Sequence, residues 1–280
     1  MPMNLQELRT FLVIIDTGSL VKASHALNVT QSTVTARLKS LEDEIGQTLL
    51  LRQKSGATLT AAGQRLQRYA ETISNLWQQA RQDVALPSAL SGVCNLACEH
   101  DLWPHLGKDF MAQLTQRFPD IGMSVWLGNA AEVARWLDEG KSDLAFTYRA
   151  ATNVRQTQRD LPPDELVLVS TDPDSPITFD PGYVFVEAGE AFGRDHALAY
   201  ADADIARLSF GNTQTAREFI LERGGSAYLP LRMVQKDLAN GRLFHLTAAP
   251  TFKRDVYLTY DTAQRANWDW FDEVVQAALH

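Results

Sequence analysis

The sequence has little cysteine and no long apolar run. Two cysteines among 280 residues cannot form the disulfide framework of a small secreted protein. No stretch approaches the roughly 18 uninterrupted apolar residues that a helix needs to cross a bilayer. The N-terminus lacks the basic segment, apolar core and small-residue cleavage site of a secretory signal. We therefore expect a cytoplasmic protein that makes no contact with a membrane.

The common catalytic and nucleotide-binding motifs are also missing. The sequence contains no G-x-S-x-G, H-E-x-x-H, P-loop or G-x-G-x-x-G pattern. Its six histidines are scattered, and only His100 and His105 lie near each other. With Cys98 and Asp101 they could offer metal ligands, but their spacing matches no common zinc pattern. We expect no enzyme activity, no metal and no cofactor.

The amino-acid composition is typical of a globular protein, with 45% apolar and 21% charged residues. The length of the chain suits two or three units. The net charge of −8 is uneven, because residues 1–86 carry +2 and the remaining 194 residues carry −10. Residues 17–41 and 45–70 contain basic residues and no acid. Such windows could meet a polyanion, although charge alone would equally fit a solvated face.

Three helices are predicted before residue 47. Apolar residues recur at helical spacing over residues 5–15, and Gly18 follows as a terminating residue. Ser19 can cap a short second helix, and Thr30 can cap a third that ends at Gly46. The third helix turns four apolar side chains inward: Val34, Leu38, Leu41 and Ile45.

The opposite face of this third helix has the chemistry of a base-reading surface. It contains no acid and consists of Gln31, Ser32, Thr33, Thr35, Arg37 and Lys39. The major groove, about 12 Å wide, admits one helix, in which glutamine pairs with adenine and arginine with guanine. A lone polar helix would more simply face water. Two short helices in front of it favour a DNA-binding module, to which Lys22 of the second helix would also contribute.

A hairpin and a long helix are predicted next. Strands at 47–52 and 57–59 would form a wing that places Arg52 and Lys54 on phosphates, where contacts fix register without reading sequence. From Thr60 to about Val84, apolar residues follow steps of three and four: Leu66, Tyr69, Ile73, Leu76, Ala80 and Val84. This narrow seam predicts a dimerisation helix. The alternative is a helix packed on its own chain.

The stretch from Asn4 to Ala70 resembles the N-terminal region of LysR-type transcriptional regulators. The resemblance rests on the run LQELRTFLVIIDTGSLVKASHALNVTQSTVTARLKSLEDEIGQTLLLR and on LTAAGQRL. It implies a winged helix-turn-helix, a dimerising linker helix and a tetrameric regulator of double-stranded DNA, with RNA polymerase as a candidate partner. One departure is Ala36, where the family often has arginine. Base preference would then rest on Gln31, Thr33 and Arg37.

The rest of the chain alternates strands and helices. The predicted order is strand 92–98, helix 103–118, strand 122–127, helix 132–139 and strand 143–148. This alternation calls for a mainly parallel sheet. Further strands are predicted at 165–170, 183–187, 208–210, 226–229, 243–246 and 255–260. Further helices are predicted at 213–223, after Pro230 and at 268–279. The fold class is therefore α/β behind the DNA-binding module.

Three pieces of this region, RFPDIGMSVWLGN, LDEGKSDLAF and DLANGRLFHL, are similar to the effector-binding domain of the same family. The resemblance implies a two-lobed, periplasmic-binding-protein-like domain. We expect a winged helix-turn-helix over 1–59, a linker helix over 60–87 and an effector domain over 88–280. Lobe I would span 88–162 and 265–280, and lobe II 163–264.

Ligands of such folds bind where strands end and helices begin. The expected cleft residues are Cys98, Glu99, His100, Asp101, Gly128, Asn129, Phe210, Asn212 and Thr213. Many relatives have uncharged residues where Glu99 and Asp101 stand, and two carboxylates would compete with an anion at a helix N-terminus. We therefore expect a cationic, zwitterionic or amine-bearing effector, or no anionic effector. Alternatively, the two acids only cap the helix.

Together these features predict a sequence-specific regulator that binds an interrupted inverted repeat as a homodimer or homotetramer. A small molecule of unknown identity in the cleft would shift its conformation. An effector-independent repressor or an architectural DNA-binding protein is the alternative. A solute-binding protein of transport is disfavoured by residues 1–86 and by the absent export signal.

Overall fold

The computed structural model describes residues 4–53, 56–84, 86, 88–153, 155–178, 180–201 and 206–279. The chain divides into two compact units, one of residues 1–88 with 138–141 and one of the remainder. Among the described residues, no helix combines the length and the apolar character needed to span a membrane. Each unit is considered by itself below.

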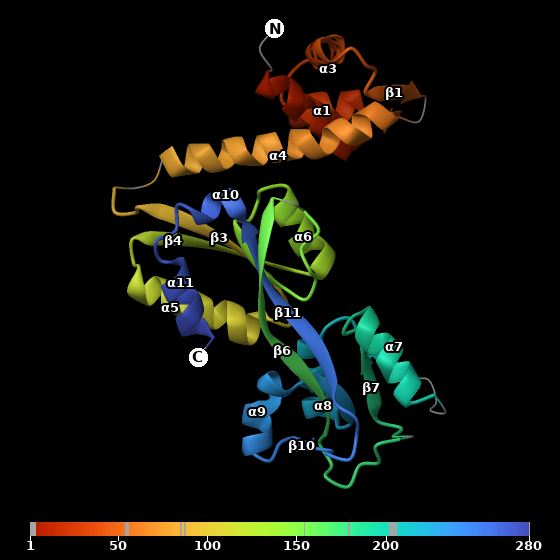
Figure 1. Ribbon diagram of the computed structural model, residues 1–280. Helices are drawn as coiled ribbons and strands as arrows, with labels where there is room; N and C mark the ends of the chain where they lie inside the picture. Colours follow the sequence, from red (N-terminus) through yellow and green to blue (C-terminus); the bar gives the residue numbers. More distant parts are fainter. Residues whose placement is uncertain are drawn as a thin grey trace. The chain divides into compact units, whose positions relative to one another are not determined.

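Three short helices form the core of the first unit (Figure 1): α1 (Leu5–Thr17), α2 (Leu20–Ala26) and α3 (Gln31–Ile45). The predicted end signals are confirmed. Gly18 and Gly46 follow α1 and α3 with φ of 64° and 71°, the left-handed region that glycine tolerates. The Ser19 and Thr30 hydroxyls cap α2 and α3. The helices bury a shared apolar cluster: Leu8, Phe11, Ile14, Val34, Leu38 and Leu41.

A two-stranded wing follows, with β1 (Leu50–Gln53) antiparallel to β2 (Gly56–Leu59). The ladder begins later than predicted because Glu42 Oε1 already accepts hydrogen bonds from the amides of Leu49 and Leu50, at 2.7 and 3.2 Å. The wing also contacts the end of α1. Gly56 has φ of 136°, and a Cβ there would stand 2.5 Å from the carbonyl oxygen of Gly18. Glycine is therefore required at this position.

The long helix α4 (Ala61–Val84) begins where the sequence predicts. Thr60 Oγ1 accepts a hydrogen bond from the Gly63 amide at 3.0 Å and donates to the Thr48 carbonyl at 2.8 Å. Gly63 brings the helix close to the strand, since a Cβ there would lie 2.2 Å from the Leu49 carbonyl oxygen. The first turns of α4 therefore have a fixed position against the wing.

The second unit is built on one nine-stranded mixed sheet in the order β4-β3-β5-β11-β6-β9-β7-β8, with β10 also paired to β6. Lobe I contains β3 (Gly92–Glu99), a π-helical turn (Trp103–Gly107), α5 (Lys108–Arg117), β4 (Ile121–Gly128), α6 (Ala130–Asp138) and β5 (Leu144–Thr147). Strand β3 is parallel to β4 and β5. This is the predicted parallel arrangement.

Lobe II repeats the alternation. It contains β7 (Tyr183–Val186), α7 (Glu190–Ala199), β8 (Leu208–Phe210), α8 (Thr213–Arg223), β9 (Ser226–Pro230), α9 (Leu231–Ala239) and β10 (Phe244–His245). Strand β7 is parallel to β8 and β9. Helix α7 was not predicted from the sequence.

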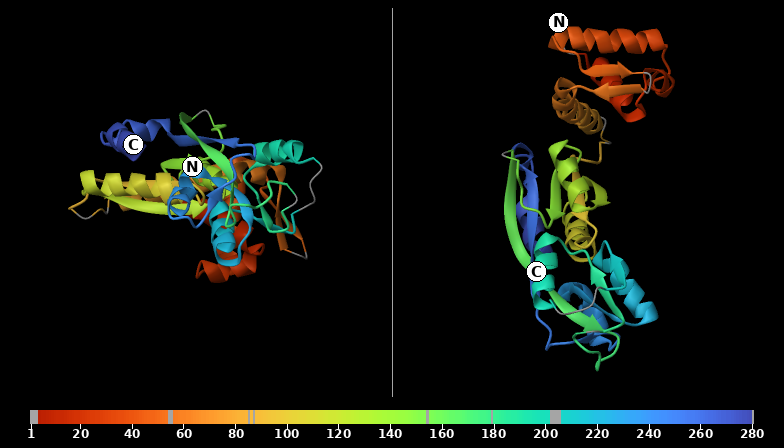
Figure 2. Two further views of the ribbon diagram at one scale, coloured as in Figure 1. Left: turned by 90° about the horizontal axis from the view of Figure 1, so that it is seen from below. Right: turned by 90° about the vertical axis from the view of Figure 1, so that its right-hand side faces the viewer.

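Two long strands join the lobes, β6 (Gln156–Ser170) and β11 (Phe252–Asp261). They pair antiparallel along most of their length and run side by side in Figure 2. The pairing is interrupted where Pro162 and Pro163 face the single residue Asp255. Proline cannot donate to a sheet, so the interruption is a bulge. Short α10 (Thr262–Arg265) and α11 (Phe271–Ala278) follow, and α11 packs on α5 in the core of lobe I.

Candidate DNA-reading face and effector cleft

The N-terminal turns of α3 present the side chains that the sequence singles out. Gln31, Ser32 and Lys39 are exposed, and Lys22 of α2 is exposed as well. Thr33 and Thr35 are half-buried. The described residues of the first two turns of α3 include no acid, so the face can approach a phosphate backbone without repulsion.

A hydroxyl cluster organises the start of α3. Thr30 Oγ1 lies 2.8 Å from both Ser32 Oγ and Thr33 Oγ1, and it accepts a hydrogen bond from the Thr33 amide. The cap therefore orients two of the predicted contact residues. Gln31 is the exposed side chain of this turn best suited to pair with a base edge.

Arg37 occupies a different environment from the one the sequence suggests. Its Nη2 donates a hydrogen bond to Gln6 Oε1 at 2.8 Å, and its Nη1 lies 3.5 Å from Thr10 Oγ1. Both partners belong to α1, so the guanidinium braces α3 against α1. Of the expected wing contacts, Lys54 lies outside the described residues, and only the backbone of Arg52 is described, in β1.

An open groove of about 700 Å³ lies between α1 and α4. Leu5, Leu12 and Val13 line it from α1, and Trp77 lines it from α4. Large apolar side chains remain exposed along α4, including Trp77 of the groove at 53% and Tyr69 at 63%. Exposed apolar surface of this extent on one helix is typical of an interaction face.

In the second unit, Glu99 and Asp101 are buried at the end of β3. Glu99 Oε1 accepts hydrogen bonds from Thr147 Oγ1 at 2.6 Å and from the Tyr148 amide at 2.8 Å. Asp101 Oδ1 accepts a hydrogen bond of 2.8 Å from the backbone amide of Thr213, the first residue of α8. Lobe I thus supplies a carboxylate to a helix N-terminus of lobe II, where negative charge is stabilised.

Arg254 of β11 sits between these two acids. Its Nη1 lies 3.1 Å from Asp101 Oδ2, and its Nη2 lies 4.0 Å from Glu99 Oε2. The guanidinium carbon also stands 3.3 Å from the centroid of the Tyr148 ring, a cation–π contact. Two buried carboxylates therefore share one guanidinium, and the cluster keeps an excess of negative charge.

The charge cluster continues toward lobe II. The Tyr148 hydroxyl donates to Asp164 Oδ2 at 2.6 Å, and Arg232 of α9 forms an ion pair with Asp164. Burial raises the pKa of Asp164, which Arg232 partly opposes. Burial, and then the charge of Asp164, raise the pKa of Tyr148 well above its usual value. Burial and Arg232 lower the pKa of the nearby His105, so its imidazole is held neutral.

The remaining predicted cleft residues have mixed positions. The Cys98 thiol is buried in the core of lobe I, and burial raises its pKa well above the usual value, so it does not line the cleft. His100 and Asn129 are exposed, and Asn129 caps α6. Asn212 caps α8 at 2.8 Å, and Phe210 packs on the lobe II core. Gly128 packs against Trp136, since a Cβ at position 128 would stand 2.6 Å from the nearest ring carbon of Trp136.

Thr213 has an additional property. Its hydroxyl is fully buried and has no hydrogen-bond partner among the described residues. This hydroxyl belongs to the same residue as the amide that binds Asp101, and its capacity for a hydrogen bond is not used by the described residues. No three His, Cys, Asp or Glu side chains in the described part of the chain gather as a metal site would require.

Four residues of the cluster escaped sequence reasoning: Tyr148, Asp164, Arg232 and Arg254. Their partners lie far away in the sequence, since Arg254 is 153 positions from Asp101. No local pattern marks them. The one available signal was the pair of consecutive bases, Lys253 and Arg254, just before the strand predicted at 255–260 in an acidic region.

Comparison with known families gives two matches. Residues 5–64 match the family model described as a bacterial regulatory helix-turn-helix protein of the lysR family. Residues 87–278 match the model described as the LysR substrate binding domain. Residues 65–86, which include most of α4, lie between the two matches.

Individual relatives share the full architecture. The transcriptional regulator HdfR of Escherichia fergusonii is 26% identical over 258 residues, which cover 91% of both chains. Full-length LysG of Corynebacterium glutamicum with bound effector Arg has a TM-score of 0.63 at 22% identity, covering 99% of this chain and 98% of its own. Vibrio fischeri DarR in complex with DNA has a TM-score of 0.55 at 20% identity, covering 100% and 99%.

Proposed function

The chain belongs to the LysR family of bacterial DNA-binding transcriptional regulators, with an effector-binding domain behind the helix-turn-helix, and from this premise we propose that it binds an interrupted inverted repeat as a dimer of dimers. The observation that carries the proposal is the exposed, acid-free start of α3, held by the Thr30 cap. Two such helices on a dimer would enter major grooves one helical turn, or a multiple of it, apart.

Dimerisation is assigned to α4 and its groove with α1. Exposed Tyr69, Leu76 and Trp77 would be covered by the same helix of a second copy. Such a symmetric contact also sets the spacing of two reading helices. The net charge of −10 on the remainder of the chain would keep non-specific DNA binding weak. RNA polymerase would be a further macromolecular partner. The activity of the protein would be regulation rather than catalysis.

A small molecule in the cleft between the lobes would shift the regulator between two arrangements. Glu99 and Asp101 share a single guanidinium, so the cluster favours a cationic or zwitterionic effector over a simple dicarboxylate. LysG of C. glutamicum, the structural relative with bound Arg, has an effector of that charge type. The unused Thr213 hydroxyl would accept or donate one hydrogen bond to such a ligand.

A second candidate is an effector-independent repressor or an architectural DNA-binding protein. It is favoured by the Asp101 carboxylate, which accepts the hydrogen bond of the first amide of α8. In that case the lobes would be held in one arrangement by the protein's own side chains.

The first experiment is recovery of genomic DNA fragments by the purified full-length protein at two salt concentrations. Recurring sites with an inverted repeat support a specific regulator. Fragments without a shared motif, lost at the higher salt, support an architectural protein. Calorimetric titration then compares arginine with succinate. Tight binding of succinate would overturn the charge argument for the cleft, and DNA binding insensitive to every ligand would favour the second candidate.

A further inference from the structure

Lobe II contains a cavity of about 570 Å³ away from the cleft. Tyr183 and Ser226, which line it, are the first residues of β7 and β9. The Asp101 contact instead lies beyond the last residue of β8, which is parallel to β7. The cavity and the cleft are therefore at opposite ends of the lobe II strands.

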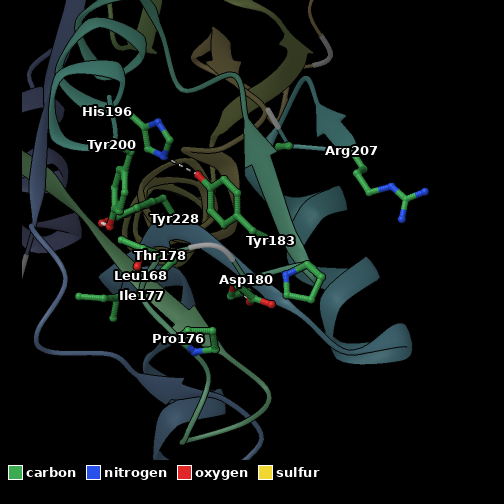
Figure 3. A pocket seen from close by; sticks show the side chains of 13 residues that line it. Leu168, Pro176, Ile177, Thr178, Asp180, Tyr183, His196, Tyr200, Arg207 and Tyr228 are labelled. Atoms are coloured by element: carbon green, nitrogen blue, oxygen red, sulfur yellow. Dashed lines mark hydrogen bonds between the residues drawn. The ribbon is translucent and has the colours of Figure 1, made fainter. Parts of the chain in front are cut away.

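The walls of the cavity are largely aromatic (Figure 3): Tyr183, His196, Tyr200 and Tyr228 converge on one side. The His196 ring stacks on Tyr183 with centroids 5.7 Å apart, and it lies 4.8 Å from the Tyr200 ring. Leu168 and Ile177 add apolar surface. Volume and lining both fall in the range of small-molecule sites, which are about 300–1,000 Å³ and mostly apolar.

Hydrogen bonds inside the protein already use the hydroxyl protons of Tyr228 and Tyr200. The Tyr228 hydroxyl donates to the Pro250 carbonyl at 2.9 Å. The Tyr228 hydroxyl has only one proton, which it gives to Pro250. The bond between Tyr228 and the Tyr200 hydroxyl, 2.7 Å away, is therefore donated by Tyr200. The Tyr200 oxygen keeps free lone pairs. This part of the wall accepts hydrogen bonds and has none left to donate.

Asp180 adds a carboxylate to the same wall. Its Oδ2 accepts hydrogen bonds from the hydroxyls of Ser175 and Ser226, and its Oδ1 accepts one from the Gly182 amide. These three partners are all neutral, and the described residues give Asp180 no ion pair within 4 Å. Arg207 also lines the cavity, but its side chain extends away from the four aromatic rings in Figure 3.

We propose that this cavity is a second ligand site, for a small molecule with one ring and a protonated amine. The ring would pack among Tyr183, Tyr200 and Tyr228, and the ammonium group would bond to Asp180 and to the free Tyr200 oxygen. A cation is favoured over aromatic faces and beside an unpaired carboxylate, whereas a carboxylate ligand would meet acceptors and like charge. The site needs neither the cleft nor DNA.

The test uses three probes of one shape on the full-length protein: 2-phenylethylamine, 2-phenylethanol and phenylacetate. Calorimetric titration should rank their affinities as amine, then alcohol, then acid, with about tenfold or more between the first and the last. Phenylacetate binding as well as the amine would overturn the proposal. So would the absence of binding for all three at millimolar concentration.

Two variants locate the binding. Asp180→Asn, which keeps the side-chain shape, should weaken the amine about tenfold and leave the alcohol nearly unchanged. Asp101→Asn, at the other end of the strands, should leave amine binding in place. If Asp101→Asn abolishes the binding and Asp180→Asn does not, the amine sits in the cleft and the second site is refuted. Should Asp180→Asn fail to fold, Ile177→Phe, which fills the cavity, must reduce binding of both amine and alcohol.

Discussion

The carboxylate of Asp101 in lobe I accepts a 2.8 Å hydrogen bond from the backbone amide of Thr213 in lobe II. The two residues are 112 positions apart in the sequence. The contact places an internal anion where this type of helix end commonly receives an external one. The arrangement of the lobes is therefore stabilised from within, and an effector that opens it would have to compete with this contact.

Removing the internal anion should create an anion site. In Asp101→Ala, the Thr213 amide and the Arg254 guanidinium lose a shared partner, so sulfate or succinate should bind between them. We expect these anions to raise the melting temperature of the variant and not of the parent protein. The measurement is thermal unfolding at matched ionic strength with chloride as the control. Equal shifts in both proteins would contradict the assignment.

Gln31→Ala should relax base preference at one position of each half-site. Loss of a bidentate contact to adenine costs about 1–3 kcal/mol of discrimination. Selection from randomised DNA, compared with the parent protein, measures it. The matched variant is Arg37→Ala. Because its guanidinium is bonded to Gln6 and Thr10, we now expect it to lower stability and to leave the preferred sequence unchanged. A changed preference would restore the base-reading role that the sequence suggests for Arg37.

Arg52→Ala should weaken binding to all DNA sequences alike. A phosphate contact carries no sequence information, and its loss should reduce the slope of log affinity against log salt by about 0.9. Fluorescence anisotropy over a salt series, with a specific and a scrambled site, gives both quantities. Weakening confined to the specific site would show that Arg52 contacts a base.

Trp77→Glu should disrupt the dimer. The side chain is 53% exposed on α4 and lines the groove with α1, so a charge there would be buried unpaired against a second copy. Sedimentation should report more monomer, and DNA affinity should fall. Leu198→Glu on α7 is the control, since Leu198 is 79% exposed in the other unit. If both variants behave alike, α4 is not the dimer contact.

Acid should destabilise lobe II partly through His196. Burial lowers its pKa below the ordinary 6.5, with Tyr183, Tyr200 and Tyr228 as the titratable groups around it. The unfolded chain binds the proton more tightly than the folded one. This contribution to stability is complete above pH 6.5 and is lost as the pH falls through the folded-state pKa.

His196→Gln should therefore flatten the decline of unfolding free energy as the pH falls below 6.5. Urea unfolding at several pH values measures it. His105→Gln is the matched variant, because the pKa of His105 is lowered as well, by burial and by Arg232. Each substitution should remove its own share of the pH dependence. An unchanged slope in His196→Gln would mean that the folded protein and the unfolded chain bind the His196 proton equally well.

Local signals explain why the first unit could be predicted closely. Thr30, Gly46 and Thr60 act within one turn of the helices they begin or end, so their effect is readable from neighbouring letters. Helix α7 lacks such signals. It begins at Glu190 after Gly189, which offers no side-chain cap, contains Gly193, and buries only Phe192. Its formation depends on aromatic packing against Tyr228 and Phe252, which lie in other strands.

Sequence reasoning placed Glu99, Asp101 and Thr213 near one another, but it did not predict the charges and hydrogen bonds around them. Strand ends pointed to Glu99, Asp101 and Thr213, which the structure brings together. The sequence could not supply Arg254 or Tyr148, because a buried charge cluster is defined by contacts between distant strands. Cys98 illustrates the opposite error. In a strand, neighbouring residues face opposite sides, so the thiol beside Glu99 points into the core.

Pro162 and Pro163, opposite Asp255, lie in the strand pair that joins the two lobes. Without amide protons they leave this short stretch of the ribbon outside the ladder, and a bulge increases local twist. We therefore expect the ribbon to twist most easily there. If one lobe rotates on the other, the axis should pass through this point of the chain, and the Asp101–Thr213 hydrogen bond should resist that rotation.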